Sequence, residues 1–236
     1  RKGRENMSIP IMIFSPHPDD AELCLGGFIL EHSKRYKILI VNLTNGDYSQ
    51  NGNNRYKESL EIQNNYKNIS YFFLNFKDFS INHFDEQQQR KIVNLIRKFR
   101  PSIIISTSEI DCHPDHKEAS YLVRRSIYAA SSNIYDGIDK KYKCKYYFQY
   151  SQELFPRDKK IVYFDITKVY EEKIALIENY KSQFYEGTRT FLNTHLLNKI
   201  KSKDQLCGSF ISVKYAEQLF LVEGEFSCIN IFKITN

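Results

Sequence analysis

The chain has 236 residues, of which 42% are hydrophobic and 26% are charged, values that fit a folded globular protein and exclude a disordered one. No apolar run approaches the roughly 18 residues that a membrane-spanning helix needs, and we find no hydrophobic signal peptide, so we expect a cytoplasmic protein. The net charge of +6 suits an anionic substrate or a nucleic acid, but no nucleic-acid-binding motif accompanies it, so we interpret the excess as a solvated surface.

The chain is expected to form one domain over residues 7–236, because no linker rich in Gly, Pro or Ser divides it. Residues 1–6 are interpreted as a remnant of an expression tag or as a disordered start. The five cysteines form no Cys-x-x-Cys pair, and an odd number does not describe a disulfide framework. We therefore expect reduced thiols, with Cys112 as a bystander beside the second of two motifs described below.

Strands and helices alternate along the first half of the chain. Apolar and β-branched runs predict strands at 9–14, 36–44, 69–74 and 102–106, and helical spacing of apolar residues predicts helices at 21–32, 55–67 and 86–99. Asp19 or Asp20 is expected to cap the first helix. This order predicts an α/β fold with a Rossmann-like, mostly parallel sheet flanked by helices. No Gly-x-Gly-x-x-Gly follows the first strand, so a nucleotide cofactor is not indicated.

The second half is expected to add a smaller α+β extension that completes the site. Its predicted elements are a helix at 118–130, strands at 144–150 and 161–166, a helix at 169–181, and a tail with a final β run at 228–234.

Two matched tetrapeptides carry the chemistry, His17-Pro18-Asp19-Asp20 and His113-Pro114-Asp115-His116. Each follows a predicted strand of the parallel sheet. Ligands bind at the carboxyl ends of such strands. The two motifs therefore form one site if their strands are neighbours.

Imidazole and carboxylate are ligands that catalytic zinc uses, with three protein groups and an open position for water. His17, Asp20 and His116 complete such a set, although another divalent metal is compatible with it. Asp19 is then the candidate general base. His113 is the candidate group for stabilising an oxyanion as an imidazolium or for protonating a leaving amine, with Asp115 or Asp111 orienting its ring. This chemistry indicates hydrolysis of an amide or ester.

Further marks surround these motifs: Ala21-Glu22 and Gly26-Gly27, then Leu43-Thr44-Asn45-Gly46-Asp47, Arg55-x-x-Glu58 and Asp111-Cys112. Together with the two His-Pro-Asp motifs, they resemble the LmbE-like, or PIG-L, deacetylases over most of the chain. Lys181-Ser182-Gln183-Phe184 and Tyr215-Ala216-Glu217 resemble weaker C-terminal marks. The resemblance implies zinc on His17, Asp20 and His116, with Asp19 as base and His113 as the electrostatic or acid group. It also implies an N-acetylated sugar substrate, usually a glucosaminide, that is cleaved to acetate and a free amine.

The substrate-binding residues are less sharply indicated. Bacillithiol-type members tend to carry Gly-Thr-Arg-Gly where this chain has Ser49-Gln50-Asn51-Gly52, so Asn51 replaces an arginine that is thought to grip the substrate. Arg55 can take over that role, or can form a surface pair with Glu58 at three-residue spacing. Further candidate sugar or anion contacts are Lys181, Tyr185 and Arg189.

Other functions stay open on sequence alone: a metal-dependent hydrolase of another amide, ester or phosphate, a non-catalytic metal- or sugar-binding protein, and a nucleic-acid binder. A binding protein needs ligands but not the spare Asp19 and His113, and nucleic-acid binding rests on charge alone. We expect a small sugar substrate as the partner, with no nucleic acid and with a homo-oligomer left open.

Overall fold

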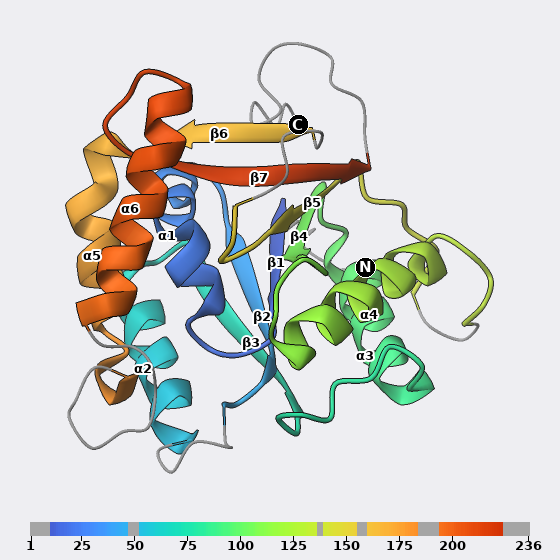
Figure 1. Ribbon diagram of the computed structural model, residues 1–236. Helices are drawn as coiled ribbons and strands as arrows, with labels where there is room; N and C mark the ends of the chain where they lie inside the picture. The colour runs from blue at the N-terminus through green and yellow to red at the C-terminus, as the bar shows by residue number, and fades with distance from the viewer. Residues whose placement is uncertain (1–9, 47–51, 136–138, 155–159, 184–193, 224–236) are drawn as a thin grey trace.

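A computed structural model describes residues 10–46, 52–135, 139–154, 160–183 and 194–223 of the protein. Within them, seven strands form one sheet in the order β3-β2-β1-β4-β5-β7-β6 (Figure 1). The strands are β1 (Ile11–Ser15), β2 (Ile38–Thr44), β3 (Ile69–Phe76), β4 (Ile103–Thr107), β5 (Tyr146–Tyr150), β6 (Ile161–Asp165) and β7 (Ala216–Glu223). The first five are parallel, and β7 runs antiparallel to both of its neighbours, β5 and β6.

Helices cover both faces of the sheet. On one face lie α1 (Asp20–Ser33), α2 (Gly52–Asn65), α5 (Tyr170–Glu178) and α6 (Thr194–Phe210), and on the other lie α3 (Glu86–Phe99) and α4 (Pro114–Ala130) (Figure 1). Two short 3-10 helices, η1 (Thr167–Val169) and η2 (Lys181–Gln183), flank α5. The mostly parallel sheet flanked by helices confirms the predicted fold class.

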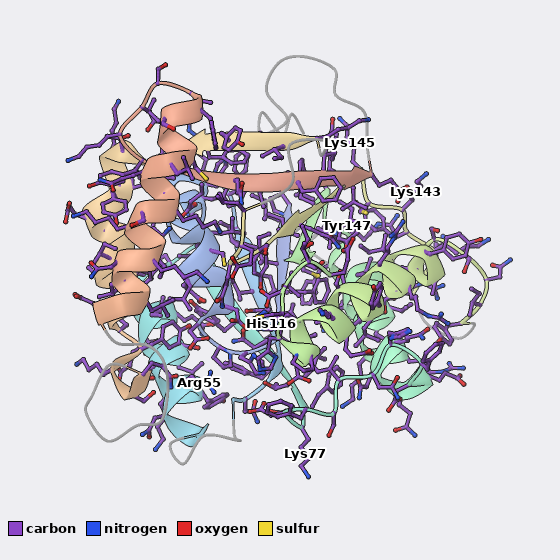
Figure 2. The ribbon with its side chains drawn as sticks, viewed as in Figure 1. Arg55, Lys77, His116, Lys143, Lys145 and Tyr147 are labelled. Carbon is purple, nitrogen blue, oxygen red and sulfur yellow. The ribbon has the colours of Figure 1, made fainter. Side chains whose placement is uncertain are left out.

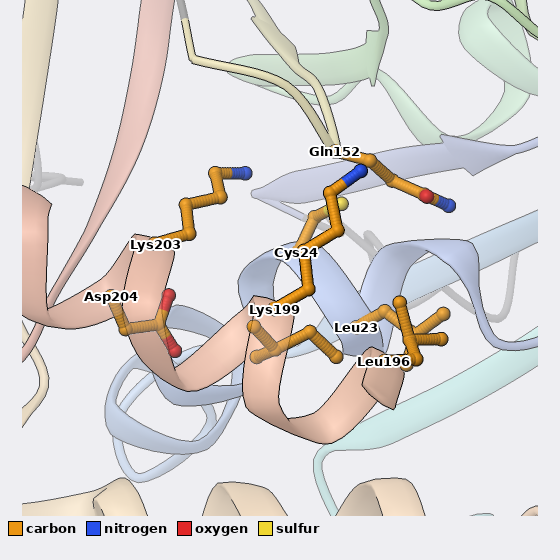
Figure 3. Close-up of a pocket in the computed structure, with 8 residues that line it drawn as sticks. Leu23, Cys24, Gln152, Leu196, Lys199, Lys203 and Asp204 are labelled. Carbon is orange, nitrogen blue, oxygen red and sulfur yellow. The ribbon is translucent and has the colours of Figure 1, made fainter. Parts of the chain in front are cut away.

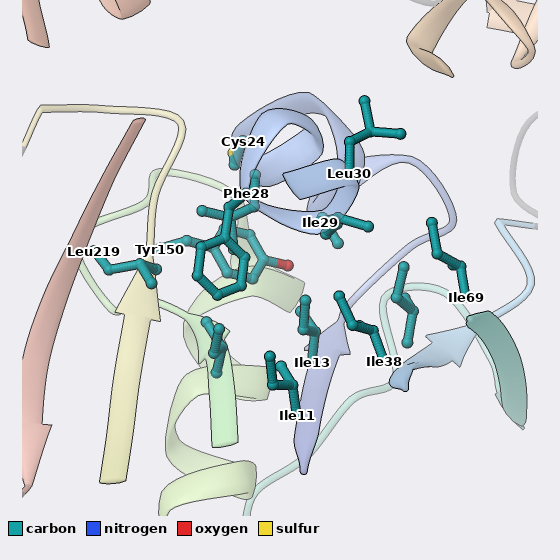
Figure 4. Close-up of a cluster of buried hydrophobic side chains, with 14 of the residues drawn as sticks. Ile11, Ile13, Cys24, Phe28, Ile29, Leu30, Ile38, Ile69, Tyr150 and Leu219 are labelled. Atoms are coloured by element: carbon teal, nitrogen blue, oxygen red, sulfur yellow. The ribbon is translucent and has the colours of Figure 1, made fainter. Parts of the chain in front are cut away.

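The central strand β1 shows why this arrangement holds. Its side chains alternate between two cores, because successive residues of a strand face opposite sides. Ile11 and Ile13 pack with Phe28 of α1 in one core (Figure 4), whereas Met12 and Phe14 join the core beneath α3 and α4. Strand β1 is thus buried on both faces, which explains why its sequence is a continuous apolar run rather than an alternating one.

Helix α1, whose first turn belongs to the site, is held by the C-terminal extension. The helix is kinked at Leu25, whose backbone leaves the helical region. The Glu217 carboxylate of β7 accepts the Gly27 and Phe28 N–H groups at 2.9 and 2.7 Å, which serves the donors that begin the second half of the helix. Position 27 requires glycine because the Ile166 side chain packs closely against its backbone: a Cβ there would lie 2.6 Å from Cγ2 of Ile166.

A buried ion cluster fixes the same region. The Lys173 ammonium of α5 lies 2.8 Å from Oε1 of Glu217 and 2.6 Å from Oδ2 of Asp204 on α6. All three side chains are buried, so two interior carboxylates share one cation. The cluster ties α5, α6 and β7 together behind α1.

The sequence predictions differ from the structure at several elements. Helix α4 begins at Pro114, not at 118, because His113 caps it: the Nδ1 atom of His113 accepts the Asp115 N–H at 3.2 Å. The expected side-chain cap of α1 is wrong, since Asp19 occupies the cap position without making that bond. Helix α6 and the antiparallel role of β7 were not predicted, and the expected β run at 228–234 lies outside the described residues.

The structure bears on the expected state of the cysteines and on the expected lack of a membrane-spanning helix. Cys24, Cys112, Cys144 and Cys207 form no disulfide in the described part of the chain, in line with the expected thiols. None of the described helices is long and apolar enough to cross a membrane.

Candidate metal and catalytic site

The site lies at the carboxyl edge of the parallel strands. The loop after β1 carries His17 to Asp20, the loop after β4 carries Asp111 to His116, and β1 and β4 are neighbours in the sheet. The two motifs therefore meet, as the sequence analysis expected. Figure 2 places the labelled His116 and Arg55 at the same end of the sheet.

Three buried side chains bring ligand atoms together. Oδ2 of Asp20 lies 3.1 Å from Nδ1 of His17 and 3.1 Å from Nε2 of His116. Ligand atoms at about 2.05 Å from a tetrahedral zinc ion are about 3.3 Å apart, so these separations fit a divalent metal of that size. The donor set, two imidazole nitrogens and one carboxylate oxygen, is also the kind that catalytic zinc uses.

A carboxylate stands behind each of these histidines. Oδ2 of Asp115 lies 3.2 Å from Nε2 of His17, and Oδ2 of Asp111 lies 2.9 Å from Nδ1 of His116. A carboxylate at the outer ring nitrogen favours a proton there and leaves the inner nitrogen for a metal. The Asp115–His17 contact is a hydrogen bond, whereas the Asp111–His116 contact is a close ion pair without hydrogen-bond alignment. We had expected Asp115 or Asp111 to orient the ring of His113, but each carboxylate instead contacts one of the other two histidines.

The charges of this cluster support one another. Burial lowers the pKa of His17, but hydrogen bonds to Asp115 and Asp20 outweigh it and raise that pKa to about 9. In His116, burial likewise opposes the charged form, yet the charge of Asp20 and the contact with Asp111 raise the pKa to about 10. Burial disfavours the Asp20 carboxylate, but the charge of His116 holds its pKa well below the usual range. The cluster is thus built to retain positive charge between its carboxylates.

A second group of ligand atoms, from His17, His113 and Asp115, also lies close enough for a metal. Its carboxylate is already engaged, because Oδ2 of Asp115 accepts the Phe79 N–H at 2.8 Å as well as facing His17. Its His113 nitrogen Nδ1 is occupied by the Asp115 N–H. All three residues of the set His17, Asp20 and His116 are buried, whereas His113 is only half-buried, so we take the first set as the better candidate metal site.

Asp19 is held in a strained, buried position beside these ligands. Its φ of 108° is unusual for a residue other than glycine, and Asp19 is only 4% exposed. Burial raises its pKa to about 7, against the opposing charge of Arg55, whose Nη1 lies 3.4 Å from Oδ2 of Asp19. A carboxyl group with this pKa can take up and release a proton near neutral pH, which is what a general base and acid must do.

The position of Arg55 is fixed by Gly46. Nη2 of Arg55 donates to the Gly46 carbonyl at 3.0 Å, and Gly46 has a φ of +72°. A Cβ at Gly46 would lie 2.5 Å from Cζ of Arg55, so the glycine both allows the turn and makes room for the guanidinium. Arg55 thus points into the site, and Glu58 does not pair with it: Glu58 accepts the Ser182 N–H at 2.7 Å and the Ser182 hydroxyl at 2.8 Å.

His113 differs from the other two histidines of the cluster. Because its Nδ1 accepts a backbone N–H at the start of α4, its proton belongs on Nε2 and the ring is neutral. Burial and the nearby charge of His116 lower its pKa, which also favours the neutral form. Both observations favour a neutral ring that is protonated on Nε2 over the expected imidazolium.

Two contacts to the site were missed by sequence reasoning. Gln152, directly after β5, donates to Oδ1 of Asp20 at 3.3 Å. Oε1 of Glu22 accepts hydrogen bonds from the Tyr71 hydroxyl at 2.6 Å and from the Tyr180 hydroxyl at 2.9 Å. These bonds link α1 to β3 and to the chain after α5. The place of Gln152 at the end of a parallel strand was the available signal. No local sequence pattern indicates that Glu22 contacts Tyr71 and Tyr180.

Gln152 also lines a small pocket between α1 and α6 (Figure 3). Its volume of about 20 Å³ holds no more than a water molecule. The pocket therefore does not accommodate a substrate. Of the remaining predicted contacts, Lys181 begins η2, and Asn51, Tyr185 and Arg189 lie outside the described residues.

Several known proteins are similar to this chain. A family model described as GlcNAc-PI de-N-acetylase, PIG-L, matches residues 12–127, which include both motifs. These residues therefore form a domain of the PIG-L family. Diacetylchitobiose deacetylase from Thermococcus kodakarensis is 25% identical over 235 residues, which cover 92% of this chain and 84% of that protein.

Solved structures support the PIG-L fold. The conserved protein TT1542 from Thermus thermophilus has a TM-score of 0.81 at 23% identity, with 93% of this chain and 97% of that chain covered. The 4-carboxy-2-hydroxymuconate hydratase GalB from Pseudomonas putida has a TM-score of 0.76 at 18% identity, with 93% and 98% covered. Because GalB is a hydratase, the fold alone does not decide the reaction.

Proposed function

We propose that this PIG-L protein is a metal-dependent hydrolase that removes the acetyl group from an N-acetylated amino sugar or sugar conjugate. One observation supports this most directly. The metal-ligand set of His17, Asp20 and His116 has a buried carboxyl group, Asp19, beside it whose pKa is raised to about 7. A site built only to bind a metal has no use for that group.

We propose zinc as the metal for two reasons. Zinc commonly binds imidazole and carboxylate ligands, and the distances between the ligand atoms of His17, Asp20 and His116 fit a tetrahedral zinc ion. A divalent ion bound there supplies Lewis acidity, which polarises an amide carbonyl and lowers the pKa of a water molecule. Asp115 and Asp111 hold the two imidazoles so that Nδ1 of His17 and Nε2 of His116 face Asp20. We therefore assign Asp115 to positioning His17 and not to direct proton transfer.

Asp19 is the proposed general base. It takes a proton from the attacking water and returns it to the departing amine, two tasks that suit a pKa of about 7. His113 lies within the same cluster, with its ring centroid 5.0 Å from that of His17 and 4.8 Å from that of His116. Its Nε2–H is proposed to donate to the oxyanion that forms when water adds to the amide.

Arg55 is proposed to serve both the base and the substrate. Its contact with Asp19 favours the ionised carboxylate, and its Nε has no partner among the described residues. Substitution of Arg55 is then expected to alter the pH profile of kcat as well as KM. Asn51, Tyr185 and Arg189 stay proposed sugar contacts on the strength of the family resemblance.

Acetate release from a panel of N-acetylglucosamine saccharides and glucosaminides tests the proposal. Wild-type protein supplied with zinc should release acetate and a free amine, and Asp19→Asn should lower kcat by at least about a hundredfold while the protein still binds metal. Unchanged turnover in Asp19→Asn would remove the proposed base. Release from a simple ester or another amide, but from no acetylated sugar, would favour the broader metal-dependent hydrolase. Hydration of an unsaturated acid without acetate release would instead favour a reaction of the GalB type.

A further inference from the structure

Phe79 has a backbone conformation that its side chain does not favour. The Ser80 N–H bonds to the Lys77 carbonyl at 3.1 Å, which closes a turn with Phe79 at its third position. Phe79 has a φ of 58° there, where glycine or asparagine is the usual residue. Such a conformation costs of the order of one to a few kcal/mol for a residue with a side chain.

The side chain of Phe79 is also largely exposed to solvent. Phe79 is 56% exposed, whereas the preceding Asp78 is 5% exposed. The bond from Phe79 to Asp115 comes from its backbone N–H, which donates to Oδ2 at 2.8 Å. Glycine would make the same bond without strain. That hydrogen bond therefore does not require a phenyl ring at this position.

The site gives the ring a role. The centroid of the Phe79 ring lies 5.4 Å from that of His113, with 38° between the planes. His113 in turn lies against His17 and His116, so the exposed Phe79 ring continues a series of rings that begins at the metal ligands. An amino sugar presents an apolar C–H face as well as hydroxyl groups. An exposed aromatic ring beside the reacting group is suited to pack against that face.

We infer that Phe79 is a substrate-positioning residue, a platform against which the sugar ring of the substrate packs while its N-acetyl group reaches the metal ligands. The inference rests on the proposed deacetylase function and adds the surface that recognises the sugar. Strain at Phe79 is then retained for binding and not for stability.

The test compares Phe79→Gly, Phe79→Ala and Phe79→Tyr with Phe84→Ala. Phe84 is the matched control because it is an exposed aromatic residue of the same segment, 71% exposed, whose ring stacks on His83 instead of on the site. Kinetics on an N-acetylglucosamine saccharide are measured together with Tm, and calorimetric binding of the same saccharide is measured in an Asp19→Asn background.

The glycine and alanine variants should raise KM and Kd about tenfold with little change in kcat, whereas Phe79→Tyr and Phe84→Ala should match the wild type. Phe79→Gly should also melt at or above the wild-type temperature, and above Phe79→Ala, because glycine relieves the positive φ. A Phe79→Gly variant with wild-type KM and Kd would overturn the inference. If the Tm of that variant also fell below the wild-type value, the ring would serve to stabilise the fold.

These results separate the inference from the proposed function. If the wild type binds the saccharide without releasing acetate, the function fails, and the Kd series still decides the role of Phe79. If the wild type releases acetate and the glycine variant keeps its KM and Kd, the inference alone fails. A wild type that binds no acetylated saccharide overturns both.

Discussion

Replacing Lys173 by methionine should destabilise the protein strongly, because it leaves two buried carboxylates without their cation. Methionine keeps the side-chain stem but removes the ammonium that lies 2.6 Å from Asp204 and 2.8 Å from Glu217. Breaking a buried ion cluster by removing one partner costs about 3–5 kcal/mol. For a chain of this size, that loss corresponds to a fall in Tm of roughly 10 °C. Urea unfolding and thermal melts measure both quantities.

The loss should depend on pH in a defined direction. Burial already raises the pKa of Asp204 to about 6, although the charge of Lys173 lowers it, so removing the lysine should raise it further. A carboxyl group whose pKa is raised by folding favours the protonated folded state, and stability falls as pH rises from its unfolded pKa through its folded one. The variant should thus lose less stability at pH 5 than at pH 8.

Two further variants sharpen this test. Lys168→Met is the matched control, since Lys168 is an exposed lysine on η1, and it should change stability by less than about 0.5 kcal/mol. Adding Asp204→Asn to Lys173→Met should recover part of the loss. A Lys173→Met protein whose free energy of unfolding lies within about 1 kcal/mol of the wild-type value, or does not depend on pH, would show that the ammonium does not stabilise the two carboxylates.

Three further predictions concern the site. Asp111→Asn should weaken zinc binding about 10- to 100-fold, because it removes the carboxylate partner of His116. Competition with a chromophoric chelator measures the affinity, and an unchanged value would contradict this. Gly46→Ala should displace Arg55, because the added Cβ would lie 2.5 Å from Cζ, and should lower kcat/KM at least about tenfold; wild-type kinetics would contradict this. In metal-free protein, the pKa values of His17 and His116 are raised to about 9 and 10, so the stability that their charges confer is complete below about pH 6.5 and lost as pH rises through those values. The Tm of chelated protein should therefore fall between pH 7 and pH 10, and a flat profile would argue against the charged cluster.

The features that sequence predicted correctly depend on local pattern. The continuous apolar runs of β1 and β4 identify buried parallel strands, and a motif that follows each of them must lie at the shared edge of the sheet. Residue chemistry then proposes His17, Asp20 and His116 as metal ligands, and the structure brings these three side chains together. None of these steps needs a contact that is distant in sequence, apart from the pairing of the two strands.

The features that sequence missed depend on distant contacts or on hydrogen-bond detail. Glu217 serves the N–H groups of Gly27 and Phe28 from about 190 residues away, and nothing in the local pattern around Glu217 announces its partners. The tautomer of His113 follows from one hydrogen bond, in which Nδ1 accepts the Asp115 N–H. The same bond caps α4, which is why the helix begins at Pro114 and not at 118. Asp115 faces His17 because the Phe79 N–H holds it there, a contact that spacing alone does not specify.

Zinc titration of the chelated protein, with metal content and acetate release from an N-acetylglucosamine saccharide followed together, tests the central claim most directly. We expect acetate release to rise linearly to a plateau at one zinc per chain, and we expect Asp20→Ala neither to retain the metal nor to release acetate at any zinc concentration used. Full release by the metal-free protein, or by Asp20→Ala without bound metal, would contradict a hydrolase that works through His17, Asp20 and His116.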